Sequence, residues 1–190
     1  MTDPSPHQAR QRLQEILAER SYQRRRVILA SGRESDFYFD SKQTVLGAEG
    51  AYLTGQLFVD AIAALPEAAE VRAIGGLELG SVPISAAVSV VSHLRRQPWD
   101  QLVVRRQPKA HGTRVAVEGA SRVPAGSVVV VVEDVVTTGG SSLKAAQRLV
   151  EEGYRVDSMV TLIDREEGGR EAIESAGFRL RSLFVRGDFE

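Results

Sequence analysis

The sequence predicts an α/β protein with a central, mainly parallel sheet flanked by helices. Five consecutive valines, Val128 to Val132, form an apolar run without alternation, which is typical of a strand covered on both faces. Strand-type and helix-type segments alternate along the chain, as they do in βαβ units. Glycine-rich turns begin near Gly75 and Gly139, after two of the strand-type segments, where open α/β sheets bind ligands.

The composition fits a single globular domain of 190 residues with 43% hydrophobic residues. No apolar stretch approaches the roughly 20 residues that a membrane span needs, and the first residues lack the apolar core of a signal peptide. Cysteine is absent, which excludes disulfide and thiolate chemistry and fits a cytoplasmic protein. With a formal net charge of -1, we expect neither nucleic acid nor a membrane as partner.

The N-terminal part predicts a helix followed by a hairpin. An amphipathic helix is expected over residues 8–20, and the basic run 24–26 is interpreted as its solvated end. A hairpin follows within 27–42, with its turn at 31–34. Its second strand carries three adjacent aromatic residues at 37–39, which cannot all enter one core because neighbours on a strand point to opposite faces. One face therefore either meets a flat ring ligand or is buried on a second side.

The middle of the chain predicts further α/β elements and a basic flap. The expected elements are a helix over 47–65, a strand over 71–75, a glycine-rich loop over 75–83, a helix over 84–94 and a strand over 101–105. The next segment, RRQPKAHG, has Ala110 as its one apolar residue. We expect a flap over about 105–121, bounded by strands, that is mobile when empty and orders around an anion. A solvated basic loop is the alternative.

The stretch after the valine run predicts a phosphate site. Glu133 and Asp134 come first, then small and hydroxyl residues at 137–142, then a helix over 143–150. Backbone N–H groups at such a turn, beside a helix N-terminus, bind phosphate. We call residues 137–141 the cradle. The adjacent acids favour a ligand with hydroxyls or a metal, such as a sugar phosphate. An ordinary turn with a solvated acidic pair is the alternative, and neither common nucleotide fingerprint is present.

The C-terminal part completes the alternating pattern. A strand over 155–163 is followed by the turn DREEGG, a helix over 171–176 and a strand over 180–185. Arg165 leaves its strand at the same carboxyl edge of the sheet as the cradle.

Four stretches, taken together, resemble the orotate branch of the type I phosphoribosyltransferase family. They occur in the family's order as SGRESDFYFD, RRQPKAHG, EDVVTTGGS and DREEGG. The resemblance implies a type I phosphoribosyltransferase fold over 1–190, with a small N-terminal hood of about residues 1–45 plus the C-terminal strand. It also implies transfer of ribose 5-phosphate from phosphoribosyl pyrophosphate (PRPP) to orotate, giving orotidine 5'-monophosphate and pyrophosphate in pyrimidine synthesis.

The resemblance also implies roles for individual residues. Contacts to PRPP fall to Arg105, Arg106, Lys109, His111, Glu133, Asp134, Val135, Val136, Thr137, Thr138, Gly139, Gly140 and Ser141. Contacts to orotate fall to Thr137, Arg165, Tyr38 and Phe39. Catalytic roles fall to Lys109, His111, Glu133 and Asp134. Within these sets, the cradle holds the 5-phosphate, the acids meet the ribose hydroxyls, the flap cations meet the pyrophosphate, and Arg165 pairs with the orotate carboxylate.

The resemblance also implies a metal and an assembly, and the sequence differs from some family members at two positions. Mg²⁺ arrives on PRPP, because the sequence shows no dedicated protein cage. A homodimer is expected, in which Arg106, Lys109 and His111 act in the neighbouring subunit's site. Ala30 and Gly80 stand where some family members have lysine, so the substrate contacts of those lysines are not carried over to these two positions.

Two other functions remain open at this level. A phosphoribosyltransferase for another base would keep the cradle, but it would have no reason to keep Arg165 and the aromatic strand. A PRPP-sensing regulator would keep the cradle but usually lose the flap, whereas this chain retains Lys109 and His111.

Overall fold

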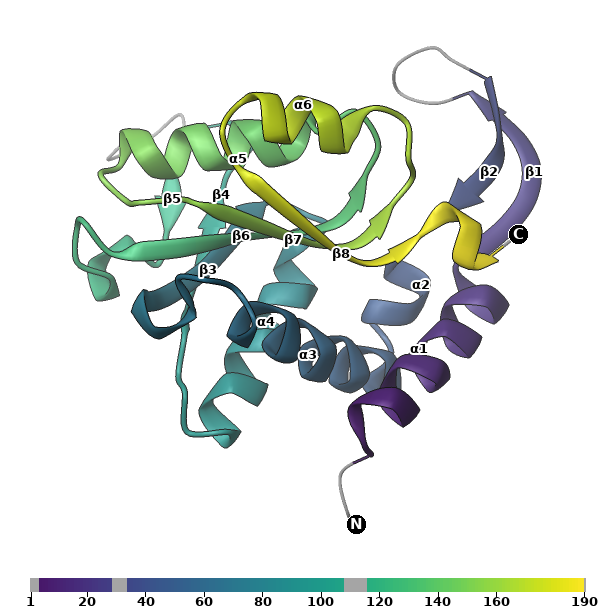
Figure 1. Ribbon diagram of the computed structural model, residues 1–190, viewed down its shortest axis with the longest axis horizontal. Helices are drawn as coiled ribbons and strands as arrows, with labels where there is room; N and C mark the ends of the chain where they lie inside the picture. The colour runs from purple at the N-terminus through teal and green to yellow at the C-terminus, as the bar shows by residue number, and fades with distance from the viewer. Residues whose placement is uncertain (1–3, 29–33, 108–115, 190) are drawn as a thin grey trace.

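The computed structural model describes residues 4–28, 34–107 and 116–189, with only the backbone described at 25–28 and 34–36. A six-stranded sheet forms its centre, and its strands pair in parallel except for the antiparallel pair β4 and β5 (Figure 1). In spatial order the strands are β5 (Val117–Glu118), β4 (Asp100–Val104), β3 (Val71–Leu77), β6 (Val128–Val136), β7 (Ser158–Asp164) and β8 (Arg179–Val185). The predicted mainly parallel α/β sheet is confirmed.

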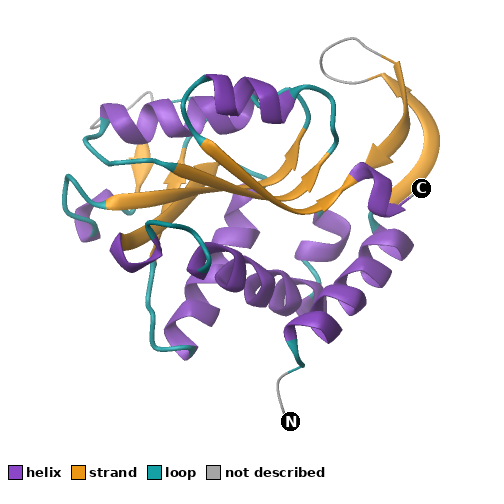
Figure 2. Ribbon diagram, viewed as in Figure 1, coloured by secondary structure: helices purple, strands orange, loops and turns teal. Residues whose placement is uncertain are grey.

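Helices cover both faces of this sheet (Figure 2). On one face lie α3 (Ala48–Ala63) and α4 (Ser81–Leu94), and on the other lie α5 (Gly140–Glu151) and α6 (Gly169–Ser175). The valine run serves both cores: Val128, Val130 and Val132 pack in the cluster that contains α3 and α4, whereas Val129 and Val131 pack in the cluster that contains α5. All five valines are buried, so the prediction of a strand covered on both faces is confirmed.

A hood formed by N-terminal elements lies at the β8 side of the sheet. It comprises α1 (Pro6–Arg20), the hairpin strands β1 (Tyr22–Ile28) and β2 (Glu34–Phe39), and the short α2 (Lys42–Val45). The antiparallel pairing of Tyr22 with Phe39 confirms the predicted hairpin, although its turn lies outside the described residues. The interpretation of 24–26 as a helix end is wrong, because α1 ends at Arg20 and the chain then pairs with β2.

The C-terminal strand, expected with the hood, joins the central sheet. β8 pairs along its length with β7 and forms an edge of the six-stranded sheet. The end of β8 still contacts the hood, because Arg10 of α1 donates to the Leu183 carbonyl oxygen and lies 4.3 Å from the centre of the Phe184 ring. The turn that follows, η3 (Arg186–Phe189), adds a further contact, in which the ring of Phe189 lies 5.6 Å from that of Phe39.

Some boundaries differ from the sequence prediction for packing reasons. Gly75 and Gly76 belong to β3 and not to a loop, and a side chain at Gly76 would lie 2.2 Å from the carbonyl oxygen of Val132 on β6. The helix α4 starts at Ser81, with Pro83 in its first turn, where a missing N–H is tolerated. Likewise β6 continues through both acids to Val136, and α5 begins at Gly140, three residues before the predicted start.

The flap is joined to the sheet as predicted. Its base is the antiparallel pair β4–β5, in which Val104 pairs with Val117, followed by the short turn η2 (Ala120–Arg122); a similar turn, η1 (Ala68–Glu70), precedes β3. Lys109, His111 and also Ala30 of the hairpin lie outside the described residues. Within the part of the chain that the structure describes, no helix has the length and apolar character to cross a membrane.

Candidate active site

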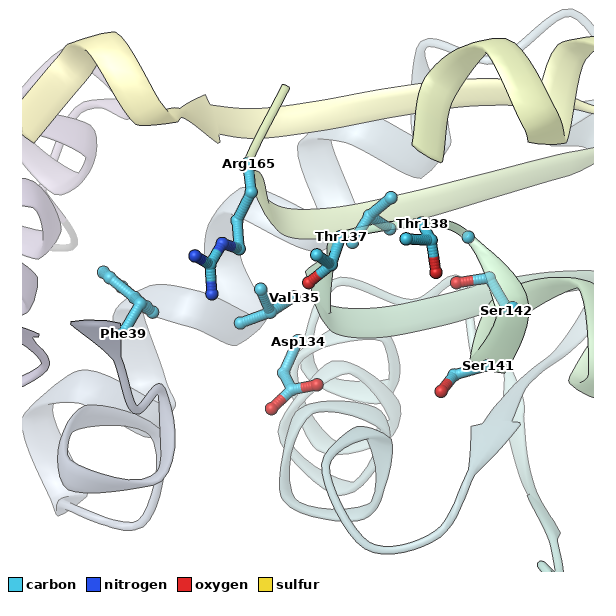
Figure 3. A pocket seen from close by; sticks show the side chains of 11 residues that line it. Phe39, Asp134, Val135, Thr137, Thr138, Ser141, Ser142 and Arg165 are labelled. Carbon is cyan, nitrogen blue, oxygen red and sulfur yellow. The ribbon is translucent and has the colours of Figure 1, made fainter. Parts of the chain in front are cut away.

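A cavity of about 360 Å³ opens where β6 ends and α5 begins. We call it the cradle cavity, and Figure 3 shows its labelled residues. It is lined by Phe39, Asp134, Val135, Val136, Thr137, Thr138, Gly139, Gly140, Ser141, Ser142 and Arg165. Hydroxyl side chains and the start of α5 stand at one end, and Arg165 with Phe39 stands at the other. The sequence-predicted cradle and Arg165 are therefore brought to one pocket.

Two glycines from different signatures shape the cradle. Gly139 adopts φ of +79°, a left-handed conformation that side chains disfavour, and it starts the turn into α5. Gly169, from the DREEGG turn, lies against it: a side chain there would stand 2.4 Å from Val136 Cγ1 and 2.7 Å from the Thr137 carbonyl oxygen. The DREEGG turn thus supports the cradle backbone, a role that the spacing of the sequence does not indicate.

The two acids at the end of β6 occupy different environments. Glu133 is 5% exposed and its Oε2 accepts a hydrogen bond of 3.2 Å from Ser142 Oγ. Burial, together with the nearby charge of Asp134, raises the pKa of Glu133 well above its ordinary value. Asp134 lines the cavity, and its Oδ2 accepts a hydrogen bond of 2.6 Å from Ser41 Oγ, at the start of α2. The carboxylate that faces the cradle cavity is therefore that of Asp134.

Arg165 and Phe39 form the end of the cavity away from α5. The Arg165 side chain is buried, donates 2.9 Å to the Phe37 carbonyl oxygen and pairs with Glu167 at 2.8 Å. These contacts hold a planar guanidinium against the hood. Phe39 lines the cavity and stacks on Phe37, with ring centroids 6.0 Å apart. Tyr38 lies between Phe37 and Phe39 in the sequence and is half-buried, but it lines neither this cavity nor the second cavity described below. Of the two predicted ring contacts, Phe39 is therefore the better placed.

A second cavity of about 280 Å³ adjoins the cradle cavity. Its lining is Lys42, Leu77, Leu79, Gly80, Arg106, Glu133, Asp134, Val135 and Ser141. Asp134, Val135 and Ser141 line both cavities, so the two form one continuous region around the end of β6. Sequence reasoning did not find Lys42, because nothing in its local pattern separates it from an ordinary charged residue at a helix start.

The two arginines at the flap base are held differently. Arg105 pairs with Glu118 at 3.2 Å across the base, and it lines neither cavity. Arg106 lines the second cavity, where its backbone N–H donates 2.8 Å to Glu78 Oε1 and its Nε donates 2.8 Å to the Glu78 carbonyl oxygen. Of the two, Arg106 is the one placed to meet an anion in its own chain.

The electrostatic pattern suits an anion with hydroxyl groups. A helix start with small residues offers N–H donors, Asp134 offers acceptors, and Arg165, Arg106 and Lys42 are spread around the rim. Over residues 4–28, 34–107 and 116–189, no group of three or more His, Cys, Asp or Glu side chains could hold a metal ion.

Comparisons with known proteins agree with this geometry. The family model described as phosphoribosyl transferase domain matches residues 69–179. The chain belongs to the phosphoribosyltransferase family. Within it, the orotate phosphoribosyltransferase of Sorangium cellulosum (strain So ce56) is 48% identical over 180 residues, covering 95% of this chain and 92% of the relative.

Solved structures extend the likeness to three dimensions. Orotate phosphoribosyltransferase of Mycobacterium tuberculosis H37Rv, in complex with Fe(III) dicitrate, has a TM-score of 0.81 at 36% identity, covering 95% of this chain and 98% of that one. The same enzyme in complex with PRPP has a TM-score of 0.76 at 32% identity, with the same coverage. The sheet and its flanking helices are therefore those of a type I phosphoribosyltransferase.

Proposed function

We propose that the protein transfers ribose 5-phosphate from PRPP to orotate, releasing pyrophosphate and forming orotidine 5'-monophosphate. One observation carries the assignment: a single cavity runs from the start of α5 to the buried guanidinium of Arg165. A phosphate at one end and a flat, carboxylate-bearing ring at the other fit this arrangement. The family membership and the names of the relatives support the same reaction.

Each end of the cavity has a defined task. Backbone N–H groups of the cradle receive the 5-phosphate, because a helix N-terminus favours an anion. Asp134 accepts hydrogen bonds from the ribose hydroxyls, and Ser41 orients its carboxylate. Arg165 presents a planar guanidinium to the orotate carboxylate, a geometry that an ammonium cannot match. Phe39 and Thr137 line the same end, against the ring.

The chemistry calls for opposite charges on the two sides of the sugar. As the glycosidic bond breaks, positive charge builds on the ribose and negative charge builds on the departing pyrophosphate. Asp134 lies on the ribose side, and the flap cations Arg106, Lys109 and His111 serve the pyrophosphate. Fixed charges of this kind typically contribute about 10²–10³ in rate for each donor. We assign the largest single contribution to Lys109.

Mg²⁺ is proposed to enter with PRPP. When bound to the diphosphate it withdraws charge from the leaving group. Asp134, which lines both cavities, is the carboxylate best placed to face it.

The test of this function is pyrophosphate release from PRPP. We expect release with orotate, dependent on Mg²⁺, and little release with hypoxanthine, xanthine or uracil in its place. If a purine or uracil supports release better than orotate does, that base is the acceptor, and the assignment of the cradle to PRPP still holds. If no base supports release although PRPP binds, the protein is a sensor and not an enzyme.

We also propose that two copies share their active sites. Arg106 lines the second cavity of its own chain, whereas Lys109 and His111, which lie outside the described residues, are proposed to act in the neighbouring subunit's site. Lys109→Ala and Asp134→Asn chains are then each inactive alone. Mixing them forms one site with both residues intact, so part of the activity returns. A mixture as inactive as its parents contradicts the shared site.

A further inference from the structure

Lys42 is the cation of the second cavity that the family resemblance does not assign. It lies at the first position of α2, directly after Ser41. Ser41 Oγ is 2.6 Å from Asp134 Oδ2, which fixes the start of α2 beside the end of β6. The Lys42 side chain thereby lines the same cavity as Asp134 and the flap-base residue Arg106.

Position 80 cannot supply a cation to this cavity without disturbing the site. A side-chain carbon added at Gly80 would lie 2.4 Å from Asp134 Oδ1 and 2.6 Å from its Cγ, closer than atoms approach in real structures. Any residue larger than glycine there must displace the Asp134 carboxylate. The lysine that some relatives carry at this position therefore has no room in the present arrangement.

Lys42 pairs with one acid but keeps donors for a ligand. Its Nζ lies 2.6 Å from Asp40 Oδ1, and this hydrogen bond raises the pKa of Lys42 against the opposing effect of burial, with further support from the charge of Asp134. An ammonium group has three N–H donors, and the pair with Asp40 uses one of them. The group is thus charged and has donors left for a second anion.

The charge balance of the second cavity indicates which anion this is. Glu133 and Asp134 stand on the β6 side, and the guanidinium of Arg106 already donates to the Glu78 carbonyl oxygen. An anionic diphosphate beside the Asp134 carboxylate needs a neighbouring cation to compensate that charge. Lys42 lines the same cavity from α2 and lies close enough to Asp134 for the charge of Asp134 to raise its pKa.

We propose that Lys42 binds the diphosphate of PRPP in the second cavity, in the place of a lysine at position 80. This inference rests on the proposed function and adds a binding residue to it. Under this assignment the hood contacts both substrates, through Phe39 at the orotate ring and Lys42 at the diphosphate of PRPP.

The experiment compares Lys42→Ala with three matched variants. Lys42→Arg keeps a cation at position 42. Asp40→Asn removes the acid that pairs with Lys42 but leaves the charge of Lys42 in place. Arg155→Ala removes an exposed, ion-paired cation that precedes β7 and lies beside the first residue of β6, at the end of the sheet away from the cavities. For each folded variant, thermal unfolding is recorded first. Binding of inorganic pyrophosphate with Mg²⁺ and the KM values for PRPP and orotate are then measured.

Loss of one charge-assisted contact predicts about a tenfold rise in the pyrophosphate Kd and in KM for PRPP for Lys42→Ala. KM for orotate changes little, Lys42→Arg recovers part of the loss, and Asp40→Asn and Arg155→Ala bind pyrophosphate like the parent. The inference is overturned if Lys42→Ala behaves like Arg155→Ala, or if Asp40→Asn reproduces its loss, since the ion pair alone would then explain it. Pyrophosphate binding needs no acceptor base, so this result stands apart from the orotate assay.

Discussion

The two adjoining cavities are built in different ways. The cradle cavity takes most of its lining from one continuous stretch, residues 134–142, and offers backbone and small side chains. The second cavity is assembled from α2, the β3–α4 connection, the flap base and the end of β6, and it offers long charged side chains. A phosphate site made of backbone depends on the course of the chain. A leaving-group site made of side chains can exchange one donor for another while the fold stays the same.

Gly80→Ala gives the largest expected effect, because it tests whether the second cavity depends on close contact with Asp134. The backbone φ of -58° accepts alanine, but the new methyl group must push the Asp134 carboxylate aside. A displacement of about 1 Å costs on the order of 10² in rate. Steady-state kinetics should show that loss in kcat/KM for PRPP. Gly187→Ala, with nothing within 4 Å, serves as control, and equal kinetics for both variants would contradict the contact.

Gly169→Ala tests the cradle through the turn that supports it. The added methyl group meets Val136 and the Thr137 carbonyl, and overpacking of this kind costs about 1–3 kcal/mol. Urea denaturation should show a free energy of unfolding lower by about 2 kcal/mol than that of Gly187→Ala. An unchanged midpoint would mean that the DREEGG turn can move away from the cradle freely.

Arg165→Lys tests the ring end of the cradle cavity. The change keeps the charge but loses the planar guanidinium that holds Phe37 and Glu167. KM for orotate should rise about tenfold, equal to one bidentate contact of about 1.4 kcal/mol. Pyrophosphate affinity should stay near that of the parent, because the second cavity does not include Arg165. A loss confined to pyrophosphate would reverse the assignment of the two ends.

Glu133→Gln gives the smallest expected effect, and it distinguishes the buried acid Glu133 from the half-buried Asp134. The folded state holds the Glu133 proton more tightly than the unfolded chain, because burial raises its pKa. Its contribution to stability is therefore full below the ordinary carboxyl pKa of about 4.3 and is lost as the pH rises through the raised value. Glutamine keeps the neutral shape at every pH. Relative to that of the parent, the free energy of unfolding of Glu133→Gln should be higher at pH 8 than at pH 5 when both are measured by denaturation. The same difference at both pH values would contradict a raised pKa.

Much of the fold and of the cradle could be predicted from local sequence. The valine run, the small-residue turn and the alternating elements each carry their signal within a few adjacent residues, and Val128 to Val132 serve two cores as expected. The boundaries of the elements were harder to predict. In the sequence Gly75 and Gly76 look like part of a loop, but they lie in a strand, where glycine is needed because neighbouring residues approach closely.

The side-chain partners of the site could not be predicted in the same way. Lys42 meets the end of β6 because Ser41 contacts Asp134, 93 residues further along the chain. Gly169 acts on Val136 through a contact between two separate turns. Such contacts depend on how whole elements pack, and no local spacing records them.

A structure of the protein with PRPP and Mg²⁺ tests the central claim most directly. The account predicts the 5-phosphate on the backbone N–H groups of residues 137–141, the ribose hydroxyls at Asp134, and the diphosphate in the second cavity within hydrogen-bond distance of Lys42. A 5-phosphate bound at Arg165, or a diphosphate outside the cavity lined by Lys42 and Arg106, would contradict it.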